Sequence, residues 1–243
     1  MNNQASTKKT PALGKLPRNV WVMTVTSFLN DVSSEMLLNL MPLFLFNVLG
    51  VRTSIVGIIE GFSEATASIL KAYSGWLSDR LGERKRLAVL GYALSTCAKP
   101  FLYFADRWLW VLGVRFTDRV GKGIRTAPRD ALVADSIAKE QRGLAFGLHR
   151  AGDTAGAVLG LVIALLIVLL TQQDESELSR STFQLVVLIS MIPAVLAVLV
   201  IGFGARDITH PQKTTSVKME TEKQPPRLSL QGFDRRFRSF LLV

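Results

Sequence analysis

The chain has 243 residues, of which 49% are hydrophobic, and carries a formal net charge of +10. Several runs of about 20 apolar residues are typical of a membrane protein. The cations lie in the gaps between these runs and form no stripe with interleaved aromatic residues, which excludes nucleic acid as a partner. A single cysteine, Cys97, excludes an intrachain disulfide and a cysteine zinc site.

Apolar segments along the chain are predicted to cross the lipid bilayer as helices. Lipid offers no hydrogen-bond partner to the backbone, and a helix pairs its backbone groups internally. Each is long enough, at about 1.5 Å per residue, for a hydrocarbon core of roughly 30 Å. In chain order the six segments are residues 20–46, 54–77, 87–105, 108–124, 144–171 and 182–204. The predicted fold class is an all-α membrane protein, with a six-helix transmembrane bundle over residues 19–204.

Positive charge is distributed unevenly between the two sets of connecting segments. One set holds 22 of the 29 Lys and Arg residues, in residues 1–18, 78–88, 119–142 and 205–238. The opposite loops hold only Arg52, Arg107 and Arg180. By the positive-inside rule the first set faces the cytoplasm. We therefore expect a multi-pass protein of the inner (cytoplasmic) membrane with both termini in the cytoplasm.

The two ends of the chain are predicted to lie outside this bundle. Residues 1–18 are interpreted as a cytoplasmic N-terminal segment, and residues 205–236 as a polar cytoplasmic linker. Residues 237–243 become apolar again and indicate the start of a truncated seventh helix.

Charged residues inside the predicted spans form helical stripes. They are costly at membrane depth and usually face protein or water. The first span carries Asp31 and Glu35, the second Glu60, Glu64 and Lys71, the fourth Arg115, Asp118, Arg119 and Lys122, and the fifth His149, Arg150 and Asp153. The third span has only Lys99, and the sixth has no charge. We expect spans one, two, four and five to enclose a polar interior, with three and six outside.

Several of these charges also have a purely structural interpretation. Glu64 and Lys71 could form an internal pair that holds helices together. Arg119 and Lys122 could extend to the cytoplasmic interface. His149 and Asp153, four residues apart, could supply two metal ligands, but no other His lies in a span, so no metal and no cofactor are predicted.

Glycines recur every fourth residue in the fifth span, at Gly152, Gly156 and Gly160. This spacing removes side chains along one helix face and allows a neighbouring helix to approach closely. A role in packing and a role in gating both fit the pattern.

The pattern Gly75-x-Leu77-x-Asp79-Arg80-x-Gly82-x-Arg84, between the second and third spans, resembles the signature loop of the major facilitator superfamily. Residues 115–123 resemble its fourth-helix motif, with Arg119 where Gly is usual. The fifth-span glycines resemble its antiporter motif, with Ala157 replacing the usual Pro. Residues 30–36 and 121–132 are similar to a bacterial subgroup.

This resemblance implies the N-terminal half of a major facilitator fold, built as a 3+3 inverted repeat, that works by alternating access. It implies that Asp79 latches the cytoplasmic side against the other half, with Arg80 and Arg115 in the same charge network. The candidate gating residues are Gly75, Asp79, Arg80, Gly82 and Arg84. The candidates for the substrate and proton pathway are Asp31, Glu35, Arg115, Asp118, His149, Arg150 and Asp153.

The predicted function is a secondary active transporter, or permease, that moves a small solute and is coupled to protons. A complete transporter of this superfamily has about 12 helices. The missing C-terminal half or a second copy is therefore an expected partner, and an incomplete, half-length chain is favoured. The alternatives are a non-transporting membrane fragment and a passive channel. An intramembrane enzyme is disfavoured, since no Gly-x-Ser-x-Gly or His-Glu-x-x-His motif occurs.

Overall fold

The computed structural model describes residues 16–172 and 177–207, all within one compact unit, Met1–Ile208. Most of the predicted N-terminal segment, nearly all of the linker and the predicted seventh helix lie outside the described residues. Ala205–Asp207 mark the beginning of the linker.

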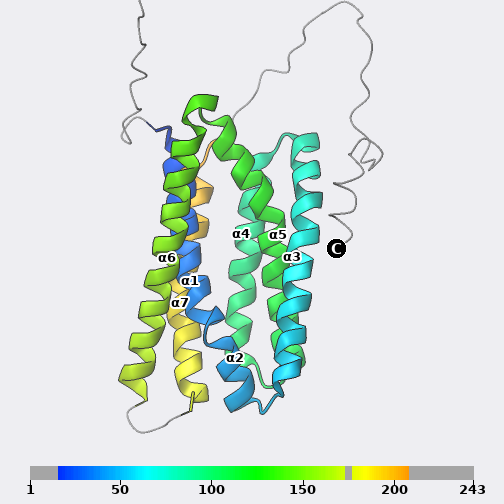
Figure 1. Ribbon diagram of the computed structural model, residues 1–243, viewed down its shortest axis with the longest axis vertical. Coiled ribbons are helices and arrows are strands. Elements are labelled where there is room, and N and C mark those ends of the chain that lie inside the picture. The colour runs from blue at the N-terminus through cyan, green and yellow to red at the C-terminus, as the bar shows by residue number, and fades with distance from the viewer. Residues whose placement is uncertain (1–15, 173–176, 208–243) are drawn as a thin grey trace, which may run out of the picture. The chain divides into compact units, whose positions relative to one another are not determined.

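The described residues are helical almost throughout (Figure 1). The long helices are α1 (Arg18–Leu38), α3 (Thr53–Leu81), α4 (Arg84–Ala98), α5 (Trp108–Asp135), α6 (Arg142–Thr171) and α7 (Arg180–Gly204). Short elements extend three of them: α2 (Met41–Leu43) and a π-helix (Phe44–Val48) follow α1, the 3-10 helix Lys99–Phe104 follows α4, and the 3-10 helix Lys139–Gln141 precedes α6. Every segment predicted as a span coincides with helical structure.

The largest difference in helix bounds is at α5. Residues 108–124 are predicted as a span, but the helix continues through Pro128 to Asp135. The stretch 119–142 is therefore mostly helix, where a connecting segment is expected. Leu132 and Val133 are fully buried beyond the proline, and this packing stabilises the extra turns.

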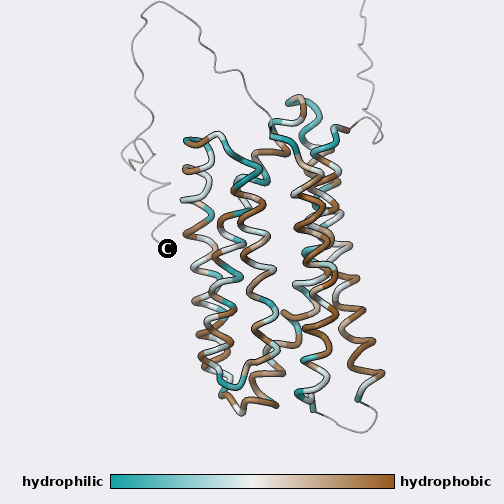
Figure 2. Tube along the Cα trace, turned by 180° about the vertical axis from the view of Figure 1, so that it is seen from behind, coloured by the Kyte–Doolittle hydropathy of each residue, from teal (hydrophilic) through white to brown (hydrophobic). Residues whose placement is uncertain are grey.

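Three helical segments of the described chain are long and apolar enough to cross a membrane by length and composition alone: Arg84–Phe104, Lys139–Thr171 and Arg180–Gly204. The helices α1, α3 and α5 are more polar, because they carry most of the charged stripes. Figure 2 shows this difference, with hydrophobic colouring over α6 and α7 and mixed colouring over α3 and α5.

The long helices pack in two groups of three. In one, α1 lies against α6 and α7; in the other, α5 lies against α3 and α4 (Figure 1). Contacts between α4 and α7 and between α1 and α5 join the groups.

Glycine positions set the closest helix contacts. A Cβ atom on Gly156 or on Gly160 would overlap the carbonyl oxygen of Phe28 or of Val32 on α1. The packing interpretation of this glycine stripe is therefore confirmed, and a gating role stays a prediction. Gly91 of α4 and Gly121 of α5 make an equally close pair.

Two apolar cores lie toward opposite ends of the bundle. One includes Phe44 stacked on Phe183, with ring centroids 3.9 Å apart. The other includes Val20, Leu132 and Ile201. Between the segments of α1 and α5 that supply these cores, both helices carry polar and charged residues, so a polar layer lies between two apolar ends.

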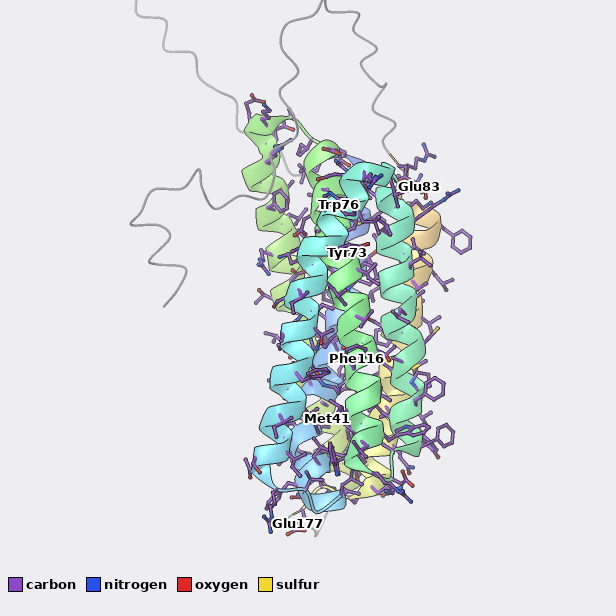
Figure 3. All side chains as sticks on the ribbon, turned by 90° about the vertical axis from the view of Figure 1, so that its right-hand side faces the viewer. Met41, Tyr73, Trp76, Glu83, Phe116 and Glu177 are labelled. Atoms are coloured by element: carbon purple, nitrogen blue, oxygen red, sulfur yellow. The ribbon has the colours of Figure 1, made fainter. Side chains whose placement is uncertain are left out.

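The outer surface of the described bundle is rich in large apolar side chains. Leu165, Leu169 and Leu170 of α6 are 53%, 62% and 75% exposed. Figure 3 shows a second such face, where Tyr73 and Trp76 lie on α3 and Phe116 lies on α5. Exposure of this extent is typical of a surface covered by lipid or by another protein.

Candidate functional site

A polar cavity of about 110 Å³ lies within the described bundle, and it is called the central cavity below. Its walls come from α1, α3 and α5 and from Lys99, directly after α4. The charged lining residues are Asp31, Glu35, Glu64, Lys99, Arg115, Asp118, Arg119, Lys122 and Arg125. Four of the predicted pathway residues, Asp31, Glu35, Arg115 and Asp118, therefore lie together.

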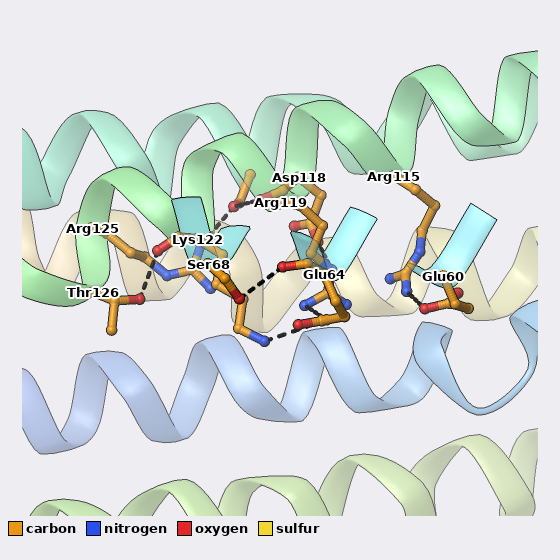
Figure 4. Close-up of polar contacts among 10 residues, drawn as sticks. Glu60, Glu64, Ser68, Arg115, Asp118, Arg119, Lys122, Arg125 and Thr126 are labelled. Atoms are coloured by element: carbon orange, nitrogen blue, oxygen red, sulfur yellow. Dashed lines mark hydrogen bonds and ion pairs between the residues drawn. The ribbon is translucent and has the colours of Figure 1, made fainter. Parts of the chain in front are cut away.

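Ion pairs connect α5 to α3 along one wall of this cavity (Figure 4). Arg115 pairs with Glu60. Arg119 Nη1 lies 3.0 Å from Glu64 Oε1 and its Nε lies 3.8 Å from Asp118 Oδ2. Lys122 Nζ lies 3.7 Å from the same Glu64 oxygen.

Two structural interpretations of the sequence are corrected by these pairs. The partner of Glu64 is Arg119, whereas Lys71 is exposed on α3. The Arg119 side chain is only 7% exposed, because it lies against Glu64 and Asp118 and does not extend into solvent. Helix periodicity places a residue on a face, but it does not determine which neighbouring helix that face meets.

Lys99 also departs from expectation. It belongs to the segment predicted to pack outside the polar interior, yet it is 3% exposed and lines the central cavity. Its ammonium group donates hydrogen bonds to the hydroxyls of Ser33 (2.6 Å) and Ser34 (3.2 Å) on α1. Lys99 follows Tyr92 and Ser95 at α-helical spacing, so it continues the buried face of α4.

Arg125 lies further along α5 than Arg115 and Arg119, and it is 6% exposed. Its Nη1 donates a hydrogen bond of 2.6 Å to Ser95 Oγ, and its guanidinium lies 4.6 Å from the centre of the Tyr92 ring. The contacts are a hydroxyl and an aromatic face, both on α4.

The two α1 carboxylates have amide partners. Asn30 Nδ2 donates to Asp31 Oδ1 at 3.1 Å, and Asn39 Nδ2 donates to Glu35 Oε2 at 3.2 Å. Within residues 16–172 and 177–207, neither carboxylate has a cation within ion-pair distance.

The remaining predicted pathway residues lie on α6, away from the lining of the central cavity. His149 Nδ1 is 3.6 Å from Asp153 Oδ1, and both side chains are largely buried. Arg150 is different, because 83% of its side chain is exposed, although its Nη1 lies 3.7 Å from Asp153 Oδ2. The His149 ring nitrogens have no hydrogen-bond partner in the described part of the chain.

A network that links α1, α4 and α5 runs through Arg129. Its Nη1 donates to Ser27 Oγ at 3.0 Å, and its Nε and Nη2 contact Asp130. Ser27 Oγ is in turn 3.1 Å from the Tyr92 hydroxyl.

The predicted gating turn joins α3 to α4. Gly82 has a φ of +66° and its N–H donates to Ser78 O at 3.0 Å, a left-handed cap that reverses the chain. Arg84 pairs with Asp135 and lies 3.5 Å from Asp79 Oδ1. This turn is therefore tied to the end of α5.

The charge network predicted around Asp79 needs correction. Arg84, not Arg115, is the cation beside Asp79, since Arg115 pairs with Glu60, nearly 20 residues earlier on α3. Arg80 lies 5.4 Å from the centre of the Trp76 ring. Gly75 lies close to α5, because a Cβ there would be 3.3 Å from Ala127 Cβ.

The sequence profile of the Major Facilitator Superfamily matches residues 23–242. The chain belongs to this superfamily. The family model and the transporter relatives point to a membrane transporter and not to an enzyme.

Relatives support this assignment. An uncharacterized MFS-type transporter of Methanocaldococcus jannaschii is 41% identical over 164 residues, which cover 68% of this chain and 41% of the relative. The multi-drug resistance efflux pump PmrA of Streptococcus pneumoniae is 25% identical, over 88% of this chain and 53% of the pump. The multidrug resistance protein MdtH of Cronobacter sakazakii is 30% identical, over 80% and 44%.

A solved structure has the same fold. The crystal structure of a bacterial homolog to the human lysosomal transporter Spinster, inward-facing and occupied, has a TM-score of 0.66 at 18% identity, over 77% of this chain and 44% of that one. The major facilitator chain thus spans about half the length of the relatives it matches.

Sequence reasoning missed the roles of Lys99, Arg125 and Arg129 in this major facilitator chain. Arg125 and Arg129 fall in the stretch expected to be cytoplasmic. The apolar pair Leu132 and Val133, which continues the helical pattern beyond Pro128, is the signal that could have extended α5 and placed both arginines on it.

Proposed function

We propose that this chain is the N-terminal six-helix part of a secondary active transporter that moves a small solute across the cytoplasmic membrane by alternating access. The central cavity carries the proposal, because it gathers nine charged residues from α1, α3, α5 and the end of α4, four of which are buried. Ionisable groups within a membrane are costly and usually mark a solute or ion pathway.

Contacts at one end of the bundle support six crossings with both described ends in the cytoplasm. Asn19, near the start of α1, exchanges hydrogen bonds of 2.9 and 3.0 Å with the backbone of Arg206, after α7. Asn19 also donates to Ser136, after α5, and the Lys85 N–H donates to Asp207. The segments predicted to be basic and cytoplasmic therefore meet at one end, as an even number of crossings requires.

Proton coupling is proposed to use Asp31 and Glu35. Both line the central cavity and both accept from amides instead of cations, so either can take up a proton without leaving a buried cation unpaired. His149 and Asp153 form a second candidate proton site. Arg150 is proposed to act only through its contact with Asp153.

A second half is proposed to complete the pathway. The regions matched in the relatives are 41–53% of their lengths, and the fold needs two six-helix halves around one site. The second half is supplied by further helices of a longer protein, by a separate chain or by a second copy. The name of PmrA, an efflux pump, favours export as the direction of transport.

Reconstitution tests this proposal. Residues 1–207 would be joined to the C-terminal half of the M. jannaschii relative, and the fusion placed in liposomes that enclose a pH-sensitive dye. A panel of anionic, neutral and cationic metabolites would then be added. We expect at least one to cause proton movement that depends on the fusion, and we expect the 243-residue chain alone to cause none.

The Asp31→Asn variant of the fusion is expected to lose proton-coupled movement, because an amide cannot carry the proton. Arg107→Gln is the matched control, since Arg107 directly precedes α5 and 81% of its side chain is exposed. Unchanged proton coupling in Asp31→Asn would refute the role of Asp31. Solute movement that does not depend on the proton gradient would instead indicate a channel. Transport by the chain alone would refute a second half from a longer protein or a separate chain, and would leave a second copy as its source.

A further inference from the structure

The cations of the central cavity differ in how they are compensated. Arg115 and Arg119 each have a carboxylate on α3, through Glu60 and Glu64. Lys99 and Arg125 have none within ion-pair distance among the described residues, although they are 3% and 6% exposed. Buried cations are normally paired, because removing an ammonium or guanidinium from water is costly.

The partners of these two cations are neutral hydrogen-bonding groups. Lys99 donates to the Ser33 and Ser34 hydroxyls, and Arg125 donates to Ser95 and lies over the Tyr92 ring. Hydroxyls orient a cation without neutralising it. Both side chains line the same cavity, whose lining holds five cations and four carboxylates, so positive charge is in excess there by one.

We propose that the central cavity binds an anionic group of the transported solute, a carboxylate or a phosphate, between Lys99 and Arg125. The inference rests on the proposed function, whose site it uses. A volume of about 110 Å³ corresponds to roughly four water molecules, which suits one such group. Lys122 lines the same cavity with a half-exposed side chain and adds positive charge at its edge.

Direct binding tests the inference without requiring transport. The full chain in lipid nanodiscs would be titrated with sodium phosphate and with sodium citrate at constant ionic strength, and with ethidium as a cationic probe. We expect saturable binding of at least one anion and none of ethidium. Preference for ethidium, or absence of anion binding, would overturn the inference.

Charge variants give effects of opposite sign. Lys99→Gln and Arg125→Gln are each expected to weaken anion binding by about tenfold, the loss of one charge-assisted hydrogen bond. Lys99→Arg should retain most of the affinity. Asp31→Asn removes a negative charge from the cavity and should tighten binding by about threefold.

Two further variants separate a binding role from a structural one. Lys122→Gln changes a half-exposed residue and should weaken anion binding by about threefold without preventing folding. Arg107→Gln, outside the cavity, should have no effect. If the Lys99, Arg125 and Lys122 variants melt at lower temperatures but bind the anion normally, these residues only hold helices together and the inference fails.

Failure of this inference and failure of the proposed function have different signatures. A fusion protein that transports only neutral or cationic metabolites refutes the anionic class and leaves the transporter proposal intact. A fusion that moves no metabolite of any class refutes the transporter proposal itself.

Discussion

The Arg119→Leu variant is expected to melt about 6–12 °C below the native protein in detergent. Arg119 lies within 3.0 Å of Glu64 and 3.8 Å of Asp118, and only 7% of its side chain is exposed. The substitution leaves Asp118, 16% exposed, without the one described cation with which it forms an ion pair. Breaking such a pair costs about 3 kcal/mol or more, and a domain of this size loses about 2–4 °C per kcal/mol.

Tryptophan fluorescence during heating measures this change. Arg107→Leu is the control, because its pair with Asp106 spans 3.9 Å and both side chains are mostly exposed, so its melting temperature should stay within about 2 °C of native. Arg119→Lys keeps the charge and should fall between the two. Equal melting temperatures for Arg119→Leu and Arg107→Leu would show that the ion pairs between α3 and α5 are solvated and contribute little to stability.

The Gly156→Ala variant is expected to melt about 4–8 °C below the native protein. Overpacking at this position should lower the free energy of unfolding by roughly 2 kcal/mol. The added Cβ would overlap the carbonyl oxygen of Phe28 and lie 3.1 Å from its Cα. Backbone atoms cannot move aside as a flexible side chain does, so α1 and α6 must separate. Any cavity wall that α1 provides would shift with it.

Gly61→Ala is the matched control on α3. No atom lies within 4 Å of the Cβ it would introduce, and alanine is the better helix former, so its melting temperature should be equal or slightly higher. A Gly156→Ala protein as stable as Gly61→Ala would contradict close packing of α1 against α6.

Most of the helices and their polar faces were predictable from the sequence. Apolar length gave the segments, and the spacing of Asp31 with Glu35 and of Arg115 with Asp118 gave stripes that line one cavity in the structure. The glycine repeat from Gly152 predicted a close helix contact, which α1 provides.

The pairing of these faces was not predictable in the same way. The charged stripe of α3 suggested Lys71 as the partner of Glu64, but tertiary packing brings Arg119 to this carboxylate. Lys99 lies inward because it continues the face of α4 that carries Ser95, and that face meets α1 and α5. Both outcomes depend on the position of a neighbouring helix, which the spacing of residues along one helix does not contain.

Cysteine accessibility in native membranes tests most directly whether a hydrated polar interior is enclosed by lipid-facing helices. In a Cys97→Ser background, Asp31→Cys and Glu35→Cys are expected to react with a charged, water-soluble methanethiosulfonate reagent. Leu165→Cys and Leu169→Cys, on the exposed apolar face of α6, are expected not to react. Reaction at the α6 positions with protection at Asp31 and Glu35 would contradict the account.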